Sequence, residues 1–176
     1  MKVYLVAGKS GSGKSEVSKI IKNYYLAKGL RVLETQFSKY LKIYAKEILG
    51  WKENEVKPRA FLQDMGVKIR KEMNKPLMFI NRMIDDLQVY EAYFDVVIIN
   101  DVRLPDEIEK INEVYQEVYS LYVVNQFQAS SLSIKEQIHE TEIALEDYSG
   151  FDTTIINDDI NSLNTKVITF IDGRHE

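Results

Sequence analysis

The 176-residue sequence predicts an α/β fold, a three-layer sandwich built on a mostly parallel central sheet. Short, almost wholly apolar runs are typical of strands buried on both faces, and here they alternate with segments of helical periodicity. A chain of this length buries roughly 68–70% of its unfolded surface, so it needs no disulfide or structural metal. We therefore expect residues 1–176 to form a single domain.

The strands are expected where apolar runs are short and continuous. Residues 2–7 lead directly into a glycine-rich segment, and residues 96–100 are expected at the centre of the sheet. The remaining strands are expected at residues 31–35, 118–124 and 153–156.

Helices are expected between the strands. Apolar residues recur at helical spacing in residues 14–28, and Gly29 stands where a C-terminal cap belongs. Ser38 is expected to cap a second helix, while Pro58 and Pro76 suit the first position of two more. Further helices are expected at 106–114, at 134–145 and after the last strand, through Leu163 and Ile171.

Two regions stand apart from the alternating pattern. Residues 37–93 hold helices without a strand, which predicts a helical insert that serves as an acceptor-binding subdomain. Residues 125–147 are a candidate lid and helix region.

Composition limits the partners. The net charge of −4 divides into +7 for residues 1–103 and −11 for residues 104–176. The basic part suits an anionic ligand, although charges that only solvate helix faces explain it equally well. A pI near 5.4 disfavours a nucleic-acid surface.

The sequence also indicates where the protein works. It has no cysteine, and its first residues are expected to form a strand rather than a signal peptide. No apolar stretch approaches the roughly 18 residues that span a bilayer. We expect a cytoplasmic protein with no membrane partner.

Residues Gly8–Ser15 match the phosphate-binding pattern G-x-x-x-x-G-K-[ST] in full. The pattern follows a predicted buried strand and opens a predicted helix, which is the context that the chemistry needs. Backbone N–H groups would face phosphate oxygens, Lys14 would reach the β- and γ-phosphates, and Ser15 would bind Mg²⁺. The expected cofactors are ATP and Mg²⁺, held by Gly8, Ser10, Gly11, Ser12, Gly13, Lys14 and Ser15.

An acidic residue follows the expected central strand. Asp101 would lie at the carboxyl edge of the sheet, where it could hold Mg²⁺ through water or receive a proton from an acceptor. The alternative is a capping or turn aspartate. Arg103 could bind a phosphate bidentately, or it could be a surface arginine.

Several segments together resemble the deoxynucleoside monophosphate kinases of bacteriophages and bacteria, a branch of the nucleotide-kinase-like P-loop fold. Residues 58–66 are similar to the R-x-L-L-Q-x-L-G helix of that family, and residues 100–107 to its D-V-R-x-P-x-E motif. Shorter similarities occur in residues 37–50, in the H-x-S-E-like pair His139 and Glu142, and in residues 155–158.

The resemblance implies a nucleoside monophosphate acceptor, and several side chains have the chemistry to bind one. Planar guanidinium groups suit a phosphate dianion, which makes Arg59, Arg70 and Arg103 candidates, with Lys42 in support. Gln63 lies one helical turn from Arg59, so its amide could read a base edge. The alternatives are surface roles for Gln63 and Arg70. His139 and Glu142 are expected to approach the phosphates or a lid, or else to form a structural pair.

One departure from nucleotide kinases concerns the lid. Between Leu104 and Gly173 the chain has no arginine, and residues 125–131 carry no charge. Lid arginines normally neutralise the transferring phosphoryl group. Transfer would then depend on Lys14, Mg²⁺, Arg103 and the arginines of the insert.

Three functions therefore remain open. The leading hypothesis is ATP-dependent phosphoryl transfer to a nucleoside monophosphate, a deoxynucleotide in particular, with Lys14, Asp101 and Arg103 as catalytic residues. A second is a kinase of a nucleoside or another small metabolite, with Asp101 as base. A third is a non-catalytic ATP-binding regulatory module. A homodimer is compatible with each of them.

Overall fold

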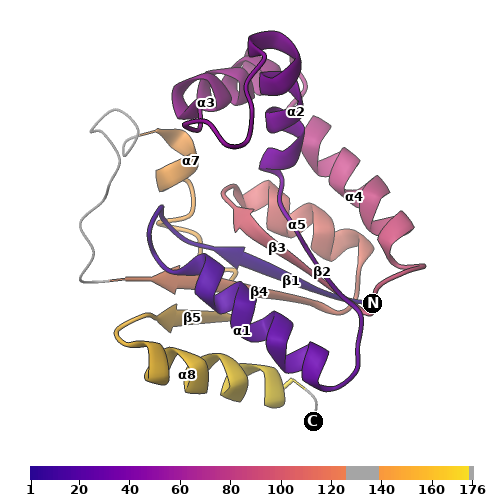
Figure 1. The fold of residues 1–176 in the computed structure, drawn as a ribbon, viewed down its shortest axis with the longest axis vertical. Helices are drawn as coiled ribbons and strands as arrows, with labels where there is room; N and C mark the ends of the chain where they lie inside the picture. The colour runs from indigo at the N-terminus through magenta and orange to yellow at the C-terminus, as the bar shows by residue number, and fades with distance from the viewer. Residues whose placement is uncertain (126–138, 175–176) are drawn as a thin grey trace.

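The computed structural model describes residues 1–125 and 139–174. Its centre is a sheet of five parallel strands in the order β2-β3-β1-β4-β5 (Figure 1). The strands are β1 (Lys2–Ala7), β2 (Val32–Thr35), β3 (Val96–Val102), β4 (Val118–Val124) and β5 (Thr153–Ile156).

Helices cover both faces of the sheet, which confirms the predicted three-layer sandwich (Figure 1). Helices α1 (Lys14–Ala27) and α8 (Ile160–Asp172) pack on one face. Helices α4 (Met78–Tyr90) and α5 (Pro105–Val114) pack on the other. The remaining helical segments are α2 (Ser38–Leu49), α3 (Arg59–Val67), the π-helical turn η1 (Lys68–Glu72) and α7 (Glu140–Ile143).

Strand β3 shows why its sequence is apolar without alternation. Val97 and Ile99 enter the core beneath α4 and α5, whereas Val96 and Ile98 enter the core beneath α1 and α8. All four side chains are fully buried. Successive residues of a strand point to opposite faces, so a strand covered on both sides needs apolar residues at every position.

The strand order places the candidate site. The chain runs from β1 to β2 and β3 on one side of the sheet, and then to β4 and β5 on the other. The carboxyl end of β1 is therefore the point where the direction of winding reverses. Ligands of open α/β sheets bind in the crevice at such a point.

The element predictions hold for most of the described chain. Strands β1, β4 and β5 have the predicted bounds, while β3 continues two residues beyond Asn100. The expected helix at 134–145 is described only from residue 139, and residues 126–138 lie outside the described part.

Two helix starts were predicted wrongly by one or two residues. Helix α3 begins at Arg59, directly after Pro58. Helix α4 begins at Met78, because the first i+4 bond of the helix runs from the N–H of Asn81 to the carbonyl of Leu77, at 2.8 Å. Proline fixes one backbone angle but does not itself decide where a helix starts.

The predicted cap at Ser38 is also wrong. Ser38 is the first residue of α2, and its hydroxyl donates to Gln36 Oε1 at 2.9 Å. Asp101 of β3 accepts the N–H groups of Phe37 and Ser38, which have no acceptor within the helix. A helix start can be capped by a residue that is distant in the sequence, provided that the fold brings its carboxylate there.

The segment predicted as a helical insert, residues 37–93, holds α2, α3, η1 and α4. Helix α4 buries Phe79, Ile80, Met83 and Leu87 in the same core as the sheet. Helices α2 and α3 extend beyond the carboxyl edge of the sheet (Figure 1). Within the described residues no helix is long and apolar enough to cross a bilayer.

Replacing Ile98 with alanine should lower the free energy of unfolding by about 2–5 kcal/mol, because it leaves a cavity in a fully buried strand. Guanidinium unfolding monitored by circular dichroism measures the change. Ile43→Ala is the matched control, since 43% of that residue is exposed. Equal losses in the two variants would contradict the assigned core.

Candidate active site

The loop between β1 and α1 has the backbone that a phosphate-binding loop requires. Gly8, Gly11 and Gly13 have φ values of 142°, 81° and 101°, all in the region that side chains disfavour. Gly13 directly precedes α1, so the positive end of that helix faces the loop. Ser10 and Ser15 lie on the same segment, Ser15 in the first turn of α1.

Two observations indicate that this loop fits a bound anion. A Cβ at Gly8 would lie 2.4 Å from the carbonyl oxygen of Val123 and 2.7 Å from Ser12 Oγ, so the backbone passes too closely for any side chain. Ser12 is 4% exposed, and its hydroxyl is buried without a hydrogen-bond partner within the described residues. A buried hydroxyl without a partner is costly unless a ligand satisfies it.

Lys14 and Arg103 meet at one carbonyl of the loop. Lys14 Nζ donates to the carbonyl oxygens of Gly8 and Lys9, both at 2.7 Å. Arg103 Nη1 donates to the same carbonyl of Gly8 at 3.3 Å. The guanidinium of Arg103 therefore lies at the loop, and its binding of a phosphate stays a prediction.

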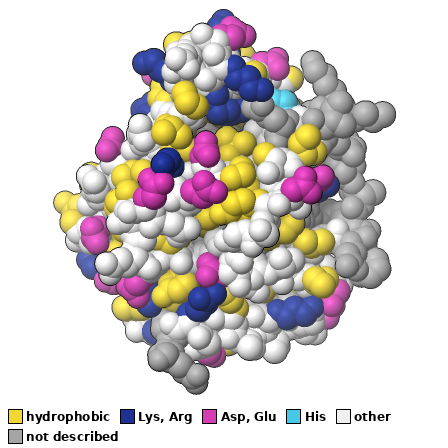
Figure 2. All heavy atoms as spheres, turned by 180° about the vertical axis from the view of Figure 1, so that it is seen from behind, with side chains coloured by type: hydrophobic (Ala, Val, Ile, Leu, Met, Phe, Trp, Pro, Cys, Tyr) yellow, Lys and Arg dark blue, Asp and Glu magenta, His cyan; other side chains and the backbone are white. Residues whose placement is uncertain are grey.

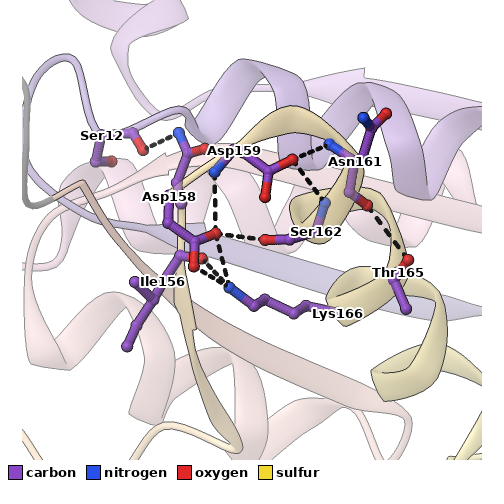
Figure 3. A network of polar contacts seen from close by, with 9 residues as sticks. Ser12, Ile156, Asp158, Asp159, Asn161, Ser162, Thr165 and Lys166 are labelled. Carbon is purple, nitrogen blue, oxygen red and sulfur yellow. Dashed lines mark hydrogen bonds and ion pairs between the residues drawn. The ribbon is translucent and has the colours of Figure 1, made fainter.

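Asn157, which carried no predicted role, supports the loop from β5. Its Nδ2 donates to the carbonyl of Ser12 at 3.0 Å. The segment after β5 is fixed in turn by Lys166, which donates to the carbonyl of Ile156 and to both oxygens of Asp158 (Figure 3). The resemblance of residues 155–158 to a family motif indicated that this segment matters, but it did not predict the hydrogen bond between Asn157 and Ser12.

Gly13→Ala should weaken nucleoside triphosphate binding more than tenfold. A Cβ at this position would lie 2.2 Å from Asn157 Nδ2 and would also strain the backbone. Gly29→Ala is the matched control, because Gly29 also has a positive φ, of 77°, but nothing lies within 4 Å of its added Cβ. Calorimetric titration with ATP separates the two, and wild-type affinity in Gly13→Ala would be the contrary result.

Asp101 joins two elements of the site. Its Oδ1 accepts the backbone N–H of Phe37 at 2.7 Å, and its Oδ2 accepts that of Ser38 at 3.0 Å. The carboxylate therefore caps α2, which was the alternative considered for it, and it also lines the cavity described next. Its role toward Mg²⁺ stays a prediction.

A cavity of about 190 Å³ lies between the carboxyl edge of the sheet and helices α2 and α3. Figure 2 shows Lys and Arg side chains gathered over this end of the molecule. Apolar side chains of Phe37, Leu41, Leu62 and Phe79 line part of it. Its charged and amide-bearing lining residues are Gln36, Lys57, Arg59, Gln63, Arg70, Asp101, Arg103 and Glu107.

The cavity brings together cations from four elements of the chain. Arg59 and Arg70 come from α3 and η1, Arg103 follows β3, and Lys57 comes from the loop before α3. Within residues 1–125 and 139–174, the side chains of Lys57 and Arg59 have no hydrogen-bond or ion-pair partner. Unpaired cations in a partly enclosed cavity favour an anionic ligand.

The sequence did not predict Lys57 as a site residue, but its position in the cavity among other cations makes it a candidate for binding an anion. Burial lowers the pKa of Lys57, and the nearby positive charges of Lys42, Arg59 and Arg103 lower it further, against the opposing effect of Asp101. The position immediately before Pro58-Arg59 was the only sequence signal for it.

Glu107 is a buried carboxyl group at the start of α5. Its Oε2 accepts the backbone N–H groups of Arg103 at 2.6 Å and Leu104 at 3.1 Å, as the third residue of a helix does in a capping box. Burial raises the pKa of Glu107 to about 8, and the charge of Asp101 adds to this rise. The two N–H groups and Arg70 act in the opposite direction.

This raised pKa predicts a pH-dependent stability. Between its ordinary pKa of 4.5 and about 8, Glu107 keeps a proton in the folded protein that the unfolded chain releases. Stability should therefore fall as pH rises from 5 to 8, by up to about 1.4 kcal/mol per pH unit from this group. Glu107→Gln should flatten that slope in urea unfolding, whereas the exposed Glu109→Gln should keep it. An unchanged slope in Glu107→Gln would contradict the assignment.

The other predicted acceptor residues lie around the cavity. Gln63 lines it, one turn from Arg59 as predicted. Lys42 does not line it directly but donates to Gln36 Oε1 at 2.8 Å, and Gln36 does. His139 bonds to Thr141, a lining residue, through Nδ1 and Oγ1 at 2.9 Å. The side chain of Glu142 lies outside the described part of the structure, as does most of the candidate lid.

The chain has a five-stranded parallel α/β fold, which it shares with the solved structures of an APS kinase and a shikimate kinase. No protein-family model matches the chain, and no curated protein matches it in sequence. Its similarity to known proteins is therefore one of structure.

Three solved structures illustrate this similarity. The APS kinase of Mycobacterium tuberculosis in complex with AMPPNP and APS is 14% identical, with a TM-score of 0.58 and 97% of each chain covered. A gluconokinase from Sinorhizobium meliloti 1021 is 12% identical, with a TM-score of 0.51 over 99% of this chain and 95% of that one. The shikimate kinase of Bacteroides thetaiotaomicron is 14% identical, with a TM-score of 0.50 over 97% and 98%.

Proposed function

We propose that the protein transfers the γ-phosphoryl group of ATP to a nucleoside monophosphate, and to a deoxynucleotide in particular. The observation that carries the proposal is the cavity beside the P-loop, in which Lys57 and Arg59 have no partner among the described residues. The motif resemblance at residues 58–66 and 100–107 supports the deoxynucleotide class.

The charges of the cavity suit an acceptor that already carries a phosphate. Lys57, Arg59, Arg70 and Arg103 supply positive charge, and only Asp101 and Glu107 oppose it among the lining residues. Glu107, whose pKa is raised to about 8, adds little negative charge at neutral pH. A phosphate dianion held by guanidinium forks would compensate this excess.

The P-loop supports the donor side. Backbone N–H groups of the loop and the start of α1 would hold the triphosphate, and Lys14 would exchange its carbonyl partners for the β- and γ-phosphates. Ser15 Oγ would bind Mg²⁺, with Asp101 as the candidate second ligand through water. Mg²⁺ characteristically takes one or two protein ligands together with substrate phosphates, where it neutralises developing charge.

These residues would act by positioning and by neutralising charge. The acceptor phosphate is itself nucleophilic, so its oxygen attacks the γ-phosphorus and the bond to the β-phosphate oxygen breaks, without a strong general base. Arg103 contacts the P-loop and also lines the acceptor cavity, so it could stabilise charge on both sides of the transferring group. Arg103 would thus supply the positive charge that lid arginines supply in other nucleotide kinases, since residues 105–173 contain no arginine.

The test is acceptor-dependent ADP release, measured by a coupled assay with each of the eight common nucleoside and deoxynucleoside monophosphates. We expect release with at least one deoxynucleotide, above the rate with ATP alone. The absence of acceptor-dependent release with all eight would reject the proposal.

A second candidate is a kinase of a small metabolite, which the structural similarity to APS, shikimate and gluconate kinases favours. The two candidates differ in what the cavity must neutralise. Arg59→Ala and Arg103→Ala should strongly raise KM for a phosphorylated acceptor, whereas KM for an uncharged acceptor such as a nucleoside should be little affected. An anionic metabolite is distinguished instead by acceptor-dependent ADP release with that metabolite and with none of the nucleoside monophosphates.

A further inference from the structure

Gly66 lies beneath the guanidinium group of Arg70. An added Cβ at Gly66 would be 3.1 Å from Arg70 Nη1 and 3.8 Å from both Cζ and Nη2. Three atoms of the guanidinium are therefore in contact with the space that a side chain at residue 66 would fill. Gly66 is buried in α3, and both residues line the acceptor cavity.

The backbone on which Arg70 stands is anchored. Residues Lys68–Glu72 form a π-helical turn, in which the N–H of Met73 donates to the carbonyl of Lys68 at 3.0 Å. The adjacent Ile69 is only 4% exposed and belongs to the main core. Irregular turns of this kind are frequent at functional sites. Because the backbone is fixed, the place of the guanidinium depends on the contacts that its long side chain makes.

Helix stability does not explain a glycine at this position. Gly66 has no positive φ, and glycine is less favourable than alanine in a helix interior. Apart from the backbone of the helix itself, the three atoms nearest to an added Cβ all belong to Arg70. The absence of a side chain at residue 66 therefore leaves room for the guanidinium of Arg70. The charge of this guanidinium also lowers the pKa of Glu107 across the cavity.

We propose that Gly66 is a positioning residue that lets the guanidinium of Arg70 lie flat in the acceptor cavity, and that it thereby sets the affinity for the acceptor phosphate. This inference rests on the proposed function, because it assigns Arg70 to the acceptor. A methyl group at residue 66 would displace Nη1 by a few tenths of an ångström, and a bidentate contact tolerates such displacements poorly.

A double-mutant cycle tests the proposal with Gly66→Ala, Arg70→Ala and the double variant. Calorimetric titration with each of the four deoxynucleoside monophosphates gives the acceptor Kd, and titration with ATP gives the donor Kd. We expect Gly66→Ala to raise the acceptor Kd at least threefold and Arg70→Ala to raise it tenfold or more. The double variant should match Arg70→Ala, the donor Kd should stay at the wild-type value, and the melting temperature should not fall below that of wild type.

A second readout needs no ligand. The Nε–Hε resonance of Arg70, assigned by its loss in Arg70→Lys, should shift in Gly66→Ala because the guanidinium moves. An unchanged resonance, additive effects in the cycle, or an unchanged acceptor Kd in Gly66→Ala would overturn the role of Gly66. Failure of the wild-type protein to bind any of the four deoxynucleotides would instead overturn the proposed function, and the inference with it.

Discussion

Lys14→Ala is expected to lower kcat for acceptor-dependent ATP consumption by about 10²–10³-fold. Lys14 Nζ lies inside the loop, 2.7 Å from two of its carbonyl oxygens, and is the lysine that the phosphate-binding pattern requires. Removal of one preorganised donor at a centre of developing charge has an effect of this size. The coupled assay at saturating ATP and acceptor measures it.

The matched control is Lys19→Ala. Lys19 lies on the same helix, α1, but is exposed to solvent. This variant should keep wild-type kcat, and both variants should melt within a few degrees of wild type. Substantial activity in Lys14→Ala would mean that the loop does not hold the reacting phosphates.

Lys57→Met and Arg59→Ala are each expected to raise KM for the acceptor by about 10- to 100-fold, while KM for ATP stays within a factor of about three. Hydrogen bonds to charged groups contribute about 1.5–3 kcal/mol, which corresponds to this range. Both side chains line the cavity, and neither has a partner in the described part of the chain that would hold it elsewhere. Steady-state kinetics with each substrate varied in turn gives the two constants.

Two substitutions outside the cavity serve as controls. Lys75→Met removes an exposed lysine from the turn before α4, and Arg82→Ala removes an arginine that contacts Tyr44 on α2. Neither should change KM for the acceptor. If the Lys57 and Arg59 variants raised KM for ATP instead, the cavity would belong to the donor.

Local patterns were sufficient where one segment determines its own structure. The apolar runs at Lys2–Ala7 and Val118–Val124 predicted β1 and β4 with their observed bounds, because burial on both faces leaves no other pattern for such short runs. The spacing of Arg59 and Gln63 likewise placed both side chains in one cavity.

Contacts between distant segments could not be predicted in this way. Asp101 caps α2 across 63 residues, so no pattern near Ser38 revealed the cap. Asn157 reaches Ser12 across 145 residues. Lys57 became recognisable only when the fold placed it among Arg59 and Arg103, because a lysine in a loop has no periodicity that distinguishes it. These contacts arise from the way the parallel strands lie beside one another, which the pattern of a single segment does not predict.

The π-helical turn is a further case. The helical spacing of Arg59 and Gln63 does not predict where α3 ends, and the structure changes to i+5 bonding at Lys68. Ile69 is buried in this turn, so its apolar side chain does not distinguish an α-helix from a π-helical turn. The contact between Gly66 and Arg70, on which the affinity for the acceptor is proposed to depend, was visible only in three dimensions.

The most direct test of the account is transfer of label from [γ-³²P]ATP to an acceptor, with the products separated by chromatography. We expect the label to appear in a deoxynucleoside diphosphate, and we expect the Lys14→Ala protein to form no labelled diphosphate above background. Label that appears only as inorganic phosphate with every nucleoside monophosphate, or that stays in ATP, would contradict it.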